Sequence, residues 1–139
     1  MNYEVYQQNS INKCIHTICI PLILITSFNI FYKITTPFSN MRYIELYCLI
    51  ISCYYLLNYS FFIWFIMSIY NTILLTISEM WIYYRHDYYC ESLQLFIISV
   101  FLKSLGHYIE GYGPCFWEQI ITIFTQAPLY SLNNIFRIL

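Results

Sequence analysis

Long apolar runs separated by short polar clusters divide this chain of 139 residues. A helix needs about 20 mostly apolar residues to cross the ~30 Å hydrocarbon core of a bilayer. Because several runs approach that length, the pattern predicts membrane-spanning helices rather than the helices of a soluble domain. The apolar segments cover approximately residues 14–32, 44–57, 61–78, 93–105 and 120–139.

The uncharged middle of the chain requires a break. Residues 46–78 would extend for about 50 Å as one helix at 1.5 Å per residue, which overshoots the bilayer. Asn58-Tyr59-Ser60 is the best candidate for the turn. The segment after residue 120 is interrupted by Gln126-Ala127-Pro128 and by Asn133-Asn134, so it either spans or lies in the interface as a bent amphipathic helix. The predicted fold class is all-α: a polytopic transmembrane helix bundle with four spans and a C-terminal helix, forming a single membrane domain.

Composition supports a membrane protein. The chain is 60% hydrophobic and only 9% charged, which is too apolar for an ordinary soluble domain. Its Lys and Arg residues are scattered and the net charge is −1, so we expect no nucleic-acid partner. Residues 1–13 lack the basic start and small-residue cleavage pattern of a removable signal peptide, so none is expected. No cysteine pair has C-x-x-C spacing, and we interpret the six as small packing residues (Cys14, Cys19, Cys48, Cys53, Cys90 and Cys115).

Two histidines are the first candidates for chemistry. His16 and His107 lie in polar clusters at the margins of apolar runs, where an ionisable side chain is unfavourable without a partner. Asn12 precedes His16 by four positions, and Glu110 follows His107 by three, so each pair shares a helix face. Four spans bring the start of the first and the end of the fourth to the same side of the membrane. The sequence therefore predicts one polar pocket built by these four residues.

The pocket residues allow two interpretations. Two imidazoles and one carboxylate suit a transition metal, and they form the facial set of non-haem Fe(II) oxygenases, which leaves positions open for O2 and substrate. Asn12 and Glu110 would then orient the rings or complete the coordination. The alternative is that each histidine donates to a nearby carbonyl or tyrosine and no metal binds. His86, in a charged stretch, is interpreted as a solvated loop residue.

Two motif strings carry a family resemblance. The first runs from Tyr6 through Asn12 and His16 to Pro21-Leu22, and the second is Gly106-His107-Tyr-Ile-Glu110-Gly-Tyr-Gly-Pro114, with Gln126-Ala-Pro-Leu-Tyr130 downstream. Together they resemble the two signatures of the small membrane family typified by the fungal 2-hydroxy fatty acid dioxygenase of the endoplasmic reticulum. The strings agree with that family in order and separation. The middle of the chain is similar only in its hydrophobic segments.

The resemblance implies an iron-dependent enzyme with several spans that uses O2 to shorten a 2-hydroxy fatty acid by one carbon. This reaction belongs to fatty acid α-oxidation and sphingoid-base breakdown. The implied cofactor is Fe2+, held by His16 and His107, with Glu110 as a catalytic residue and Asn12 in support. The implied partners are membrane lipid, a fatty acyl substrate and O2, and the implied location is the endoplasmic reticulum membrane.

The chain departs from the family at two places. The first histidine of the family aligns with Gln7, a weak neutral ligand, and the following proline aligns with Ser10. The second signature is one residue shorter between its histidine and its proline. The chain is thus interpreted as a divergent enzyme or as a non-catalytic membrane protein with the same fold, while a small channel or transporter subunit is the third alternative. Lys103, one turn before His107, either attracts a fatty acid carboxylate or extends toward the membrane interface.

Overall fold

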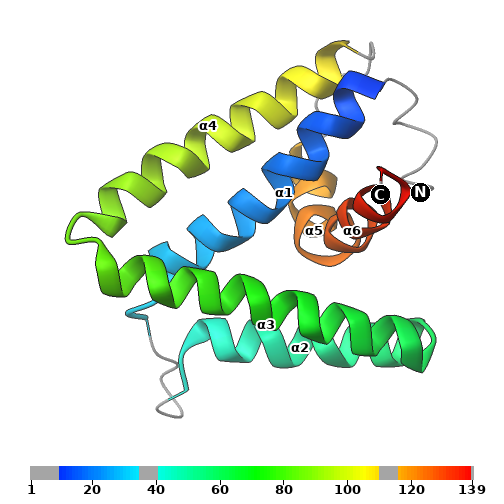
Figure 1. The fold of residues 1–139 in the computed structure, drawn as a ribbon, viewed down its shortest axis with the longest axis horizontal. Helices are drawn as coiled ribbons and strands as arrows, with labels where there is room; N and C mark the ends of the chain where they lie inside the picture. Colours follow the sequence, from blue (N-terminus) through cyan, green and yellow to red (C-terminus); the bar gives the residue numbers. More distant parts are fainter. Residues whose placement is uncertain (1–9, 35–40, 110–115, 139) are drawn as a thin grey trace. The chain divides into compact units, whose positions relative to one another are not determined.

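Six α-helices account for most of the residues that the structure describes (Figure 1). The structure is a computed structural model, and it describes residues 10–34, 41–109 and 116–138, with side chains for all of these except His107, 116–120 and 134–138. No strand occurs in these ranges, so the predicted all-α fold class is confirmed for them. The helices are α1 (Ser10–Phe31), α2 (Tyr43–Asn58), α3 (Phe61–Tyr84), α4 (Tyr88–Ile109), α5 (Phe116–Thr125) and α6 (Ala127–Ile138).

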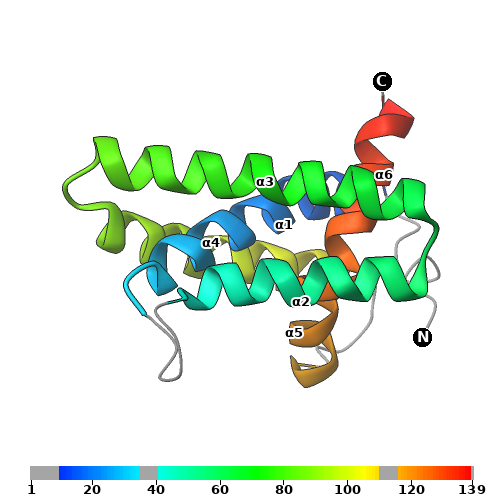
Figure 2. The same cartoon turned by 90° about the horizontal axis from the view of Figure 1, so that it is seen from below.

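The predicted break in the middle of the chain is confirmed. Helix α2 ends at Asn58, and Ser60 caps α3 by accepting a hydrogen bond from the backbone N–H of Ile63 at 3.4 Å. The two helices then run back along each other as an antiparallel pair (Figure 2). The Trp64 indole N–H donates to Ser52 Oγ at 2.8 Å across this pair. The turn therefore joins two packed apolar helices.

The helices extend beyond several of the apolar segments. Helix α1 begins at Ser10, before the apolar segment that starts near residue 14, while α3 continues to Tyr84 and α4 extends beyond 93–105 at both ends. Polar and charged residues are tolerated in the exposed terminal turns of a helix, which ends where its backbone changes direction, so the helices are longer than the apolar runs within them.

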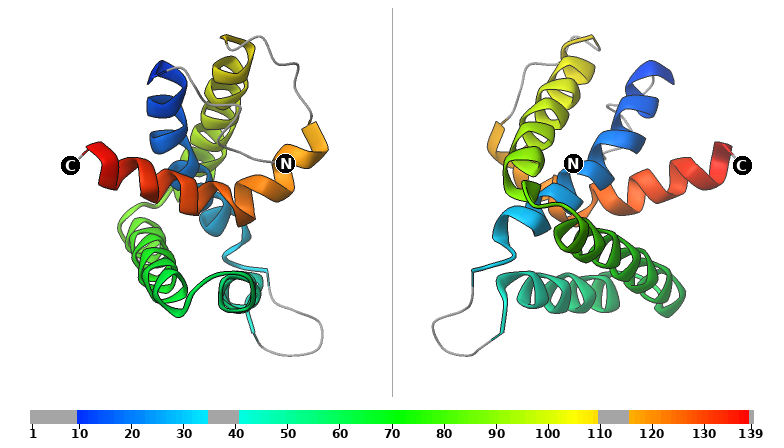
Figure 3. Two further views of the ribbon diagram at one scale, coloured as in Figure 1. Left: turned by 90° about the vertical axis from the view of Figure 1, so that its right-hand side faces the viewer. Right: turned by 60° about the vertical axis from the view of Figure 1, so that its left-hand side comes forward.

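The C-terminal segment forms two helices that meet at Gln126 (Figure 3). The backbone N–H of Gln126 donates to the Thr122 carbonyl at 3.0 Å, and Pro128 lies in the first turn of α6, where its missing N–H is not needed. The predicted interruption at Gln126-Ala127-Pro128 is thus confirmed. Asn133-Asn134 interrupts the apolar pattern but not the helix, because α6 continues through both residues.

Two of the described helices, α1 and α3, are long and apolar enough to cross a membrane. Helix α2 is apolar, but its 16 residues extend for only about 24 Å, short of the ~30 Å core. Helix α4 is as long as α1 but is less apolar. The lengths and composition therefore support a membrane protein through α1 and α3, and they do not establish the four predicted spans.

The chain divides into two compact units. Unit 1 comprises Met1–Leu24 and Gln94–Leu139, and unit 2 comprises Ile25–Leu93. Both α1 and α4 contribute residues to each unit.

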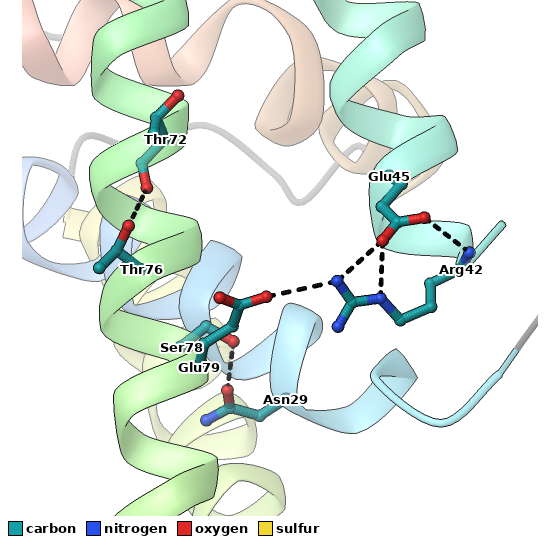
Figure 4. Close-up of polar contacts among 7 residues, drawn as sticks. All are labelled: Asn29, Arg42, Glu45, Thr72, Thr76, Ser78 and Glu79. Carbon is teal, nitrogen blue, oxygen red and sulfur yellow. Dashed lines mark hydrogen bonds and ion pairs between the residues drawn. The ribbon is translucent and has the colours of Figure 1, made fainter.

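A buried hydrogen-bond chain links three helices within unit 2. Ser78 Oγ of α3 donates to Asn29 Oδ1 of α1 at 2.5 Å (Figure 4), and Asn29 Nδ2 donates to Ser92 Oγ of α4 at 2.8 Å. All three residues are buried. Because a buried amide is stable only when its groups are satisfied, this chain fixes which residues of the three helices face one another.

Two groups of ion pairs also lie in unit 2. Arg42 contacts Glu45 at 2.8 Å and Glu79 at 3.3 Å (Figure 4), and its hydrogen bonds hold the pKa of Glu45 below the ordinary value. Arg85 contacts Glu91 at 2.6 Å. Hydrogen bonds from Arg85, and then from Trp81, lower the pKa of Glu91.

Unit 1 contains a hydrogen bond that compensates for a proline inside α1. Pro21 has no N–H, so it cannot bond the carbonyl of Thr17, four residues earlier. Ser131 Oγ of α6, which is fully buried, donates to this carbonyl at 3.1 Å. The proline therefore creates the acceptor that attaches α6 to α1.

Candidate functional site

The first half of α1 has a buried polar face. Asn12, His16 and Cys19 follow one another at spacings of four and three residues, which places them on one side of the helix. Asn12 and His16 are fully buried, and Cys19 is almost so. Buried amide and imidazole groups are unusual in an otherwise apolar helix, and they indicate either a packing role or a binding role.

A second buried face lies on the C-terminal half of α4. Ser99, Lys103 and Gly106 are spaced by four and three residues and are all buried. The exposed fraction of Lys103 is only 2%. Of the two alternatives for this lysine, extension toward the membrane interface does not fit its burial, because an extended lysine keeps its ammonium group accessible.

Gly106 and Asn12 bring these two faces together within unit 1. A Cβ atom added at Gly106 would overlap Oδ1 of Asn12 and would lie 3.3 Å from its Cγ and 3.8 Å from Cγ2 of Ile15. The amide of Asn12 therefore lies against the backbone of α4 at Gly106, where any larger side chain would have to displace it. The polar segment at the start of α1 meets the end of α4, as the sequence predicts.

Lys103 faces the same surface of α1. Its ammonium group lies close enough to Cys19 for an electrostatic interaction with the thiol. Since Gly106 contacts Asn12 and Lys103 interacts with Cys19, the two helices run antiparallel here, and His16 lies on the α1 face between these points. We name this group, comprising Asn12, His16, Cys19 and Lys103, the α1–α4 polar cluster.

The cluster contains groups with unused hydrogen-bonding capacity. Neither the Nδ2 nor the Oδ1 atom of buried Asn12 has a hydrogen-bond partner among the described residues. Lys103 likewise makes no ion pair in the described part of the chain, where the three pairs involve Arg42 and Arg85. Buried polar groups in folded proteins nearly always have partners, so these atoms are exceptions within the described part of the chain.

The remaining predicted ligands lie beyond the described side chains. His107 is in α4 directly after Gly106, but its side chain is not described, and Gln7 and Glu110 lie outside the described residues. Among the side chains that the structure does describe, no three His, Cys, Asp or Glu residues come together. The set of His16, His107 and Glu110 therefore remains a prediction.

Other sequence interpretations have mixed outcomes. His86 is exposed in the turn between α3 and α4, as predicted. Of the cysteines that the structure describes, all are free thiols, and Cys19 is buried as expected for a packing residue. Cys14, Cys53 and Cys90 are exposed, so the packing interpretation is wrong for these three.

Two residues of the site, Gly106 and Cys19, are not among the site residues predicted from the sequence. The sequence nevertheless carries a signal for each. A glycine near the end of an apolar helix indicates close helix contact, and the spacing of Cys19 from Asn12 and His16 places it on their face.

Searches of protein-family models, curated proteins and solved structures gave no match to this chain. The family resemblance therefore depends on the two motif strings alone.

Proposed function

We propose that this chain is an integral membrane, Fe2+-dependent dioxygenase that acts on 2-hydroxy fatty acids, in the endoplasmic reticulum. The observation that carries the proposal is the packing of Asn12 against Gly106. It supports the proposal because Asn12 belongs to one motif string and Gly106, adjacent to His107, belongs to the other. Residues from opposite ends of the chain are thereby available to a single site.

The donors present suit iron. The imidazole of His16 is fully buried and lies on the same face as the unsatisfied amide of Asn12. In the proposed site His16 and His107 hold the metal, Glu110 supplies a carboxylate, and Asn12 orients an imidazole ring. Gln7 takes the place of a family histidine as a weaker supporting group. When bound, the metal would supply the activation of O2.

The residues of the chain would hold and shield the substrate. The long apolar helices α1 and α3 match a bilayer, so a fatty acyl tail can stay in lipid while its carboxylate reaches the α1–α4 polar cluster. The burial of His16 and Lys103 excludes water from the position where the carboxylate and the 2-hydroxyl would lie.

Iron content tests this proposal most simply. Detergent-purified protein loaded with Fe2+ without oxygen is expected to retain stoichiometric iron, and His16→Ala and His107→Ala are expected to bind it about 10–100-fold more weakly. His86→Ala, which removes an exposed imidazole, is the matched control and should retain the iron of the parent. Equal iron in the His16 and His86 variants would contradict the proposal.

Turnover provides the second readout. The parent is expected to consume one O2 per 2-hydroxy acid and to release a fatty acid shortened by one carbon, with the lost carbon leaving as CO2 and the remaining oxygen as water, whereas the His16 and His107 variants should not. The Gln7→His variant, which restores a family histidine, should bind iron more tightly than the parent. Absence of iron from both the parent and this variant would rule out the enzyme.

A non-catalytic membrane protein with the same fold is the second candidate. The contact between Asn12 and Gly106 favours it, because this contact also packs α1 against α4 without any metal. In that case the polar cluster acts only in helix association. Variants at His16 would then change the unfolding temperature, while neither iron nor turnover would be detected in the parent.

A further inference from the structure

Lys103 is a buried cation. Its exposed fraction is 2%, and no described residue forms an ion pair with it. Transfer of an ammonium group out of water is strongly unfavourable unless an anion or several hydrogen-bond acceptors replace the lost hydration. Cys19, the neighbour with which it interacts, is a thiol and a poor substitute for a carboxylate. An anion is therefore the group that this position lacks.

Asn12 adds a second, independent observation. Its amide is fully buried and unsatisfied among the described residues, and it lies against Gly106, one turn along α4 from Lys103. The amide N–H groups and the ammonium group together present several hydrogen-bond donors. No described carboxylate belongs to this cluster. A donor-rich, buried site with one positive charge suits a monoanion.

The side chains around the cluster indicate which kind of molecule carries the anionic group. The outward faces of α1 and α4 beside the cluster are apolar, with Ile11, Ile18, Leu102 and Leu105 all exposed. A hydrocarbon chain can lie along such a face, whereas a small hydrophilic anion gains nothing from it.

We infer that Lys103 and Asn12 bind the carboxylate of a single-chain amphiphile, with Lys103 as the counter-ion and the Asn12 amide as a second donor. This inference rests on the proposed function only for the identity of the amphiphile as a 2-hydroxy fatty acid. The binding itself requires no iron.

Binding of radiolabelled palmitate to iron-free protein in detergent micelles tests the inference. We expect saturable binding above empty micelles, and Lys103→Met should weaken it about tenfold, as for loss of one charge-assisted hydrogen bond. Lys103→Arg retains the charge and should bind more tightly than Lys103→Met. Lys33→Met, which removes an exposed lysine, should bind like the parent. Equal binding by the Lys103→Met and Lys33→Met variants would overturn the inference.

Competition identifies the chemistry of the ligand. Unlabelled palmitate should displace the label, whereas its uncharged methyl ester and short-chain hexanoate should not. Displacement by the ester would show that the carboxylate is not recognised. Displacement by hexanoate at the same concentration would show a site for small anions. Either result would overturn the assignment to an amphiphile carboxylate.

Thermal unfolding of the ligand-free protein distinguishes a bound anion, which is external to the chain, from a carboxylate of the chain itself. If the anion is external, Lys103→Met should not lower the unfolding temperature, because it removes an unpaired buried charge. Palmitate should then raise the unfolding temperature of the parent and not that of the variant. A lower temperature for Lys103→Met, reproduced by Glu110→Gln or Glu118→Gln, would show a counter-ion on the chain and would overturn the inference.

The iron and palmitate experiments fail independently. If the protein binds palmitate but has no affinity for iron, the carboxylate site is supported and the oxygenase proposal is excluded. If the protein binds iron but its palmitate binding does not depend on Lys103, the carboxylate site is excluded and the oxygenase proposal is supported.

Discussion

Asn12 and Gly106 show how single residues determine the packing of two apolar helices. The Asn12 amide occupies the space that a side chain at position 106 would need. Asn29 has a comparable effect in unit 2, where its amide bonds Ser78 and Ser92. The packing is thus specified by the shape of the amide at Asn12 and by the hydrogen bonds of the amide at Asn29.

The contact at Gly106 predicts that the effect of Gly106→Ala on the free energy of unfolding depends on whether Asn12 is present, which a double-mutant cycle measures. Gly106→Ala should destabilise the parent by about 1–3 kcal/mol, because the added methyl group overlaps Asn12. In an Asn12→Ala background the overlap is gone, so the same change should be neutral or stabilising by up to about 1 kcal/mol, since alanine favours helix over glycine. Denaturant unfolding in detergent measures all four variants. Equal destabilisation in both backgrounds would show that the contact is absent.

At the level of helices, Pro21 and Ser131 form a matched pair. The proline leaves the Thr17 carbonyl without its intrahelical donor, and the serine of α6 supplies one. The bond therefore links a local feature of α1 to the docking of α6 within unit 1. It also explains why α6 has a polar residue in a buried position.

The effect of removing the Ser131 hydroxyl on stability is expected to depend on Pro21. Ser131→Ala should lower the free energy of unfolding by about 1–3 kcal/mol, because a buried carbonyl loses its donor. After Pro21→Ala, the new N–H at position 21 can bond Thr17, so the serine change should have a smaller effect. The coupling energy from the four unfolding curves measures the difference. Additive effects would contradict this account of α1.

The ion pairs of unit 2 predict a loss of stability in acid. Hydrogen bonds from Arg85 and Trp81 lower the pKa of Glu91 in the folded chain, so their stabilising contribution is present above the ordinary glutamate value of 4.5 and is lost as the pH falls through the lowered pKa. The unfolding temperature should therefore decline as the pH falls below 4.5. In Glu91→Gln the decline should be smaller. An identical acid profile for parent and variant would contradict the assignment.

The sequence predicted those elements that depend on local composition and on length. The turn at Asn58-Tyr59-Ser60 followed from the excessive length of one uncharged helix, and the break at Gln126 followed from a proline. Helices α3 and α4 are longer than the apolar segments within them, because polar residues in exposed terminal turns continue a helix. The bonds of Asn29 were not predictable, because its partners lie far away in sequence and any buried serine could have served.

For the candidate site, the sequence predicted which helix ends meet but not which side chains are buried between them. The spacing of Asn12 and His16 indicated a polar face, and the order of the apolar runs indicated its meeting with the end of α4. The burial of Lys103 depends on how closely the helices approach at Gly106, which a one-dimensional pattern does not encode. Lysine near a helix end ordinarily reaches water, so the general rule gave the wrong answer here.

For the whole molecule, apolar surface is the dominant feature. Large hydrophobic side chains are exposed along the described parts of α1 to α4, and α1 and α3 are long and apolar enough to cross a membrane. In the described interior, buried Asn, His, Ser and Lys side chains accompany an apolar core that includes Ile20, Leu24 and Met67, and so many buried polar groups are uncommon in water-soluble proteins. In a membrane this arrangement is favourable, because lipid solvates the exterior while the polar groups satisfy one another or bind a ligand.

The central claim is that polar residues from opposite ends of the chain meet at one site, and a disulfide cross-link tests it most directly. In a chain whose six native cysteines are replaced by alanine, cysteines introduced by Asn12→Cys and Gly106→Cys should join under mild oxidation, and mass spectrometry of the digested protein should identify the linked peptides. The control pair, Ile11→Cys with Gly106→Cys, should not join, because Ile11 is exposed on another face of α1. Linkage of the control pair but not of the 12–106 pair would contradict the account.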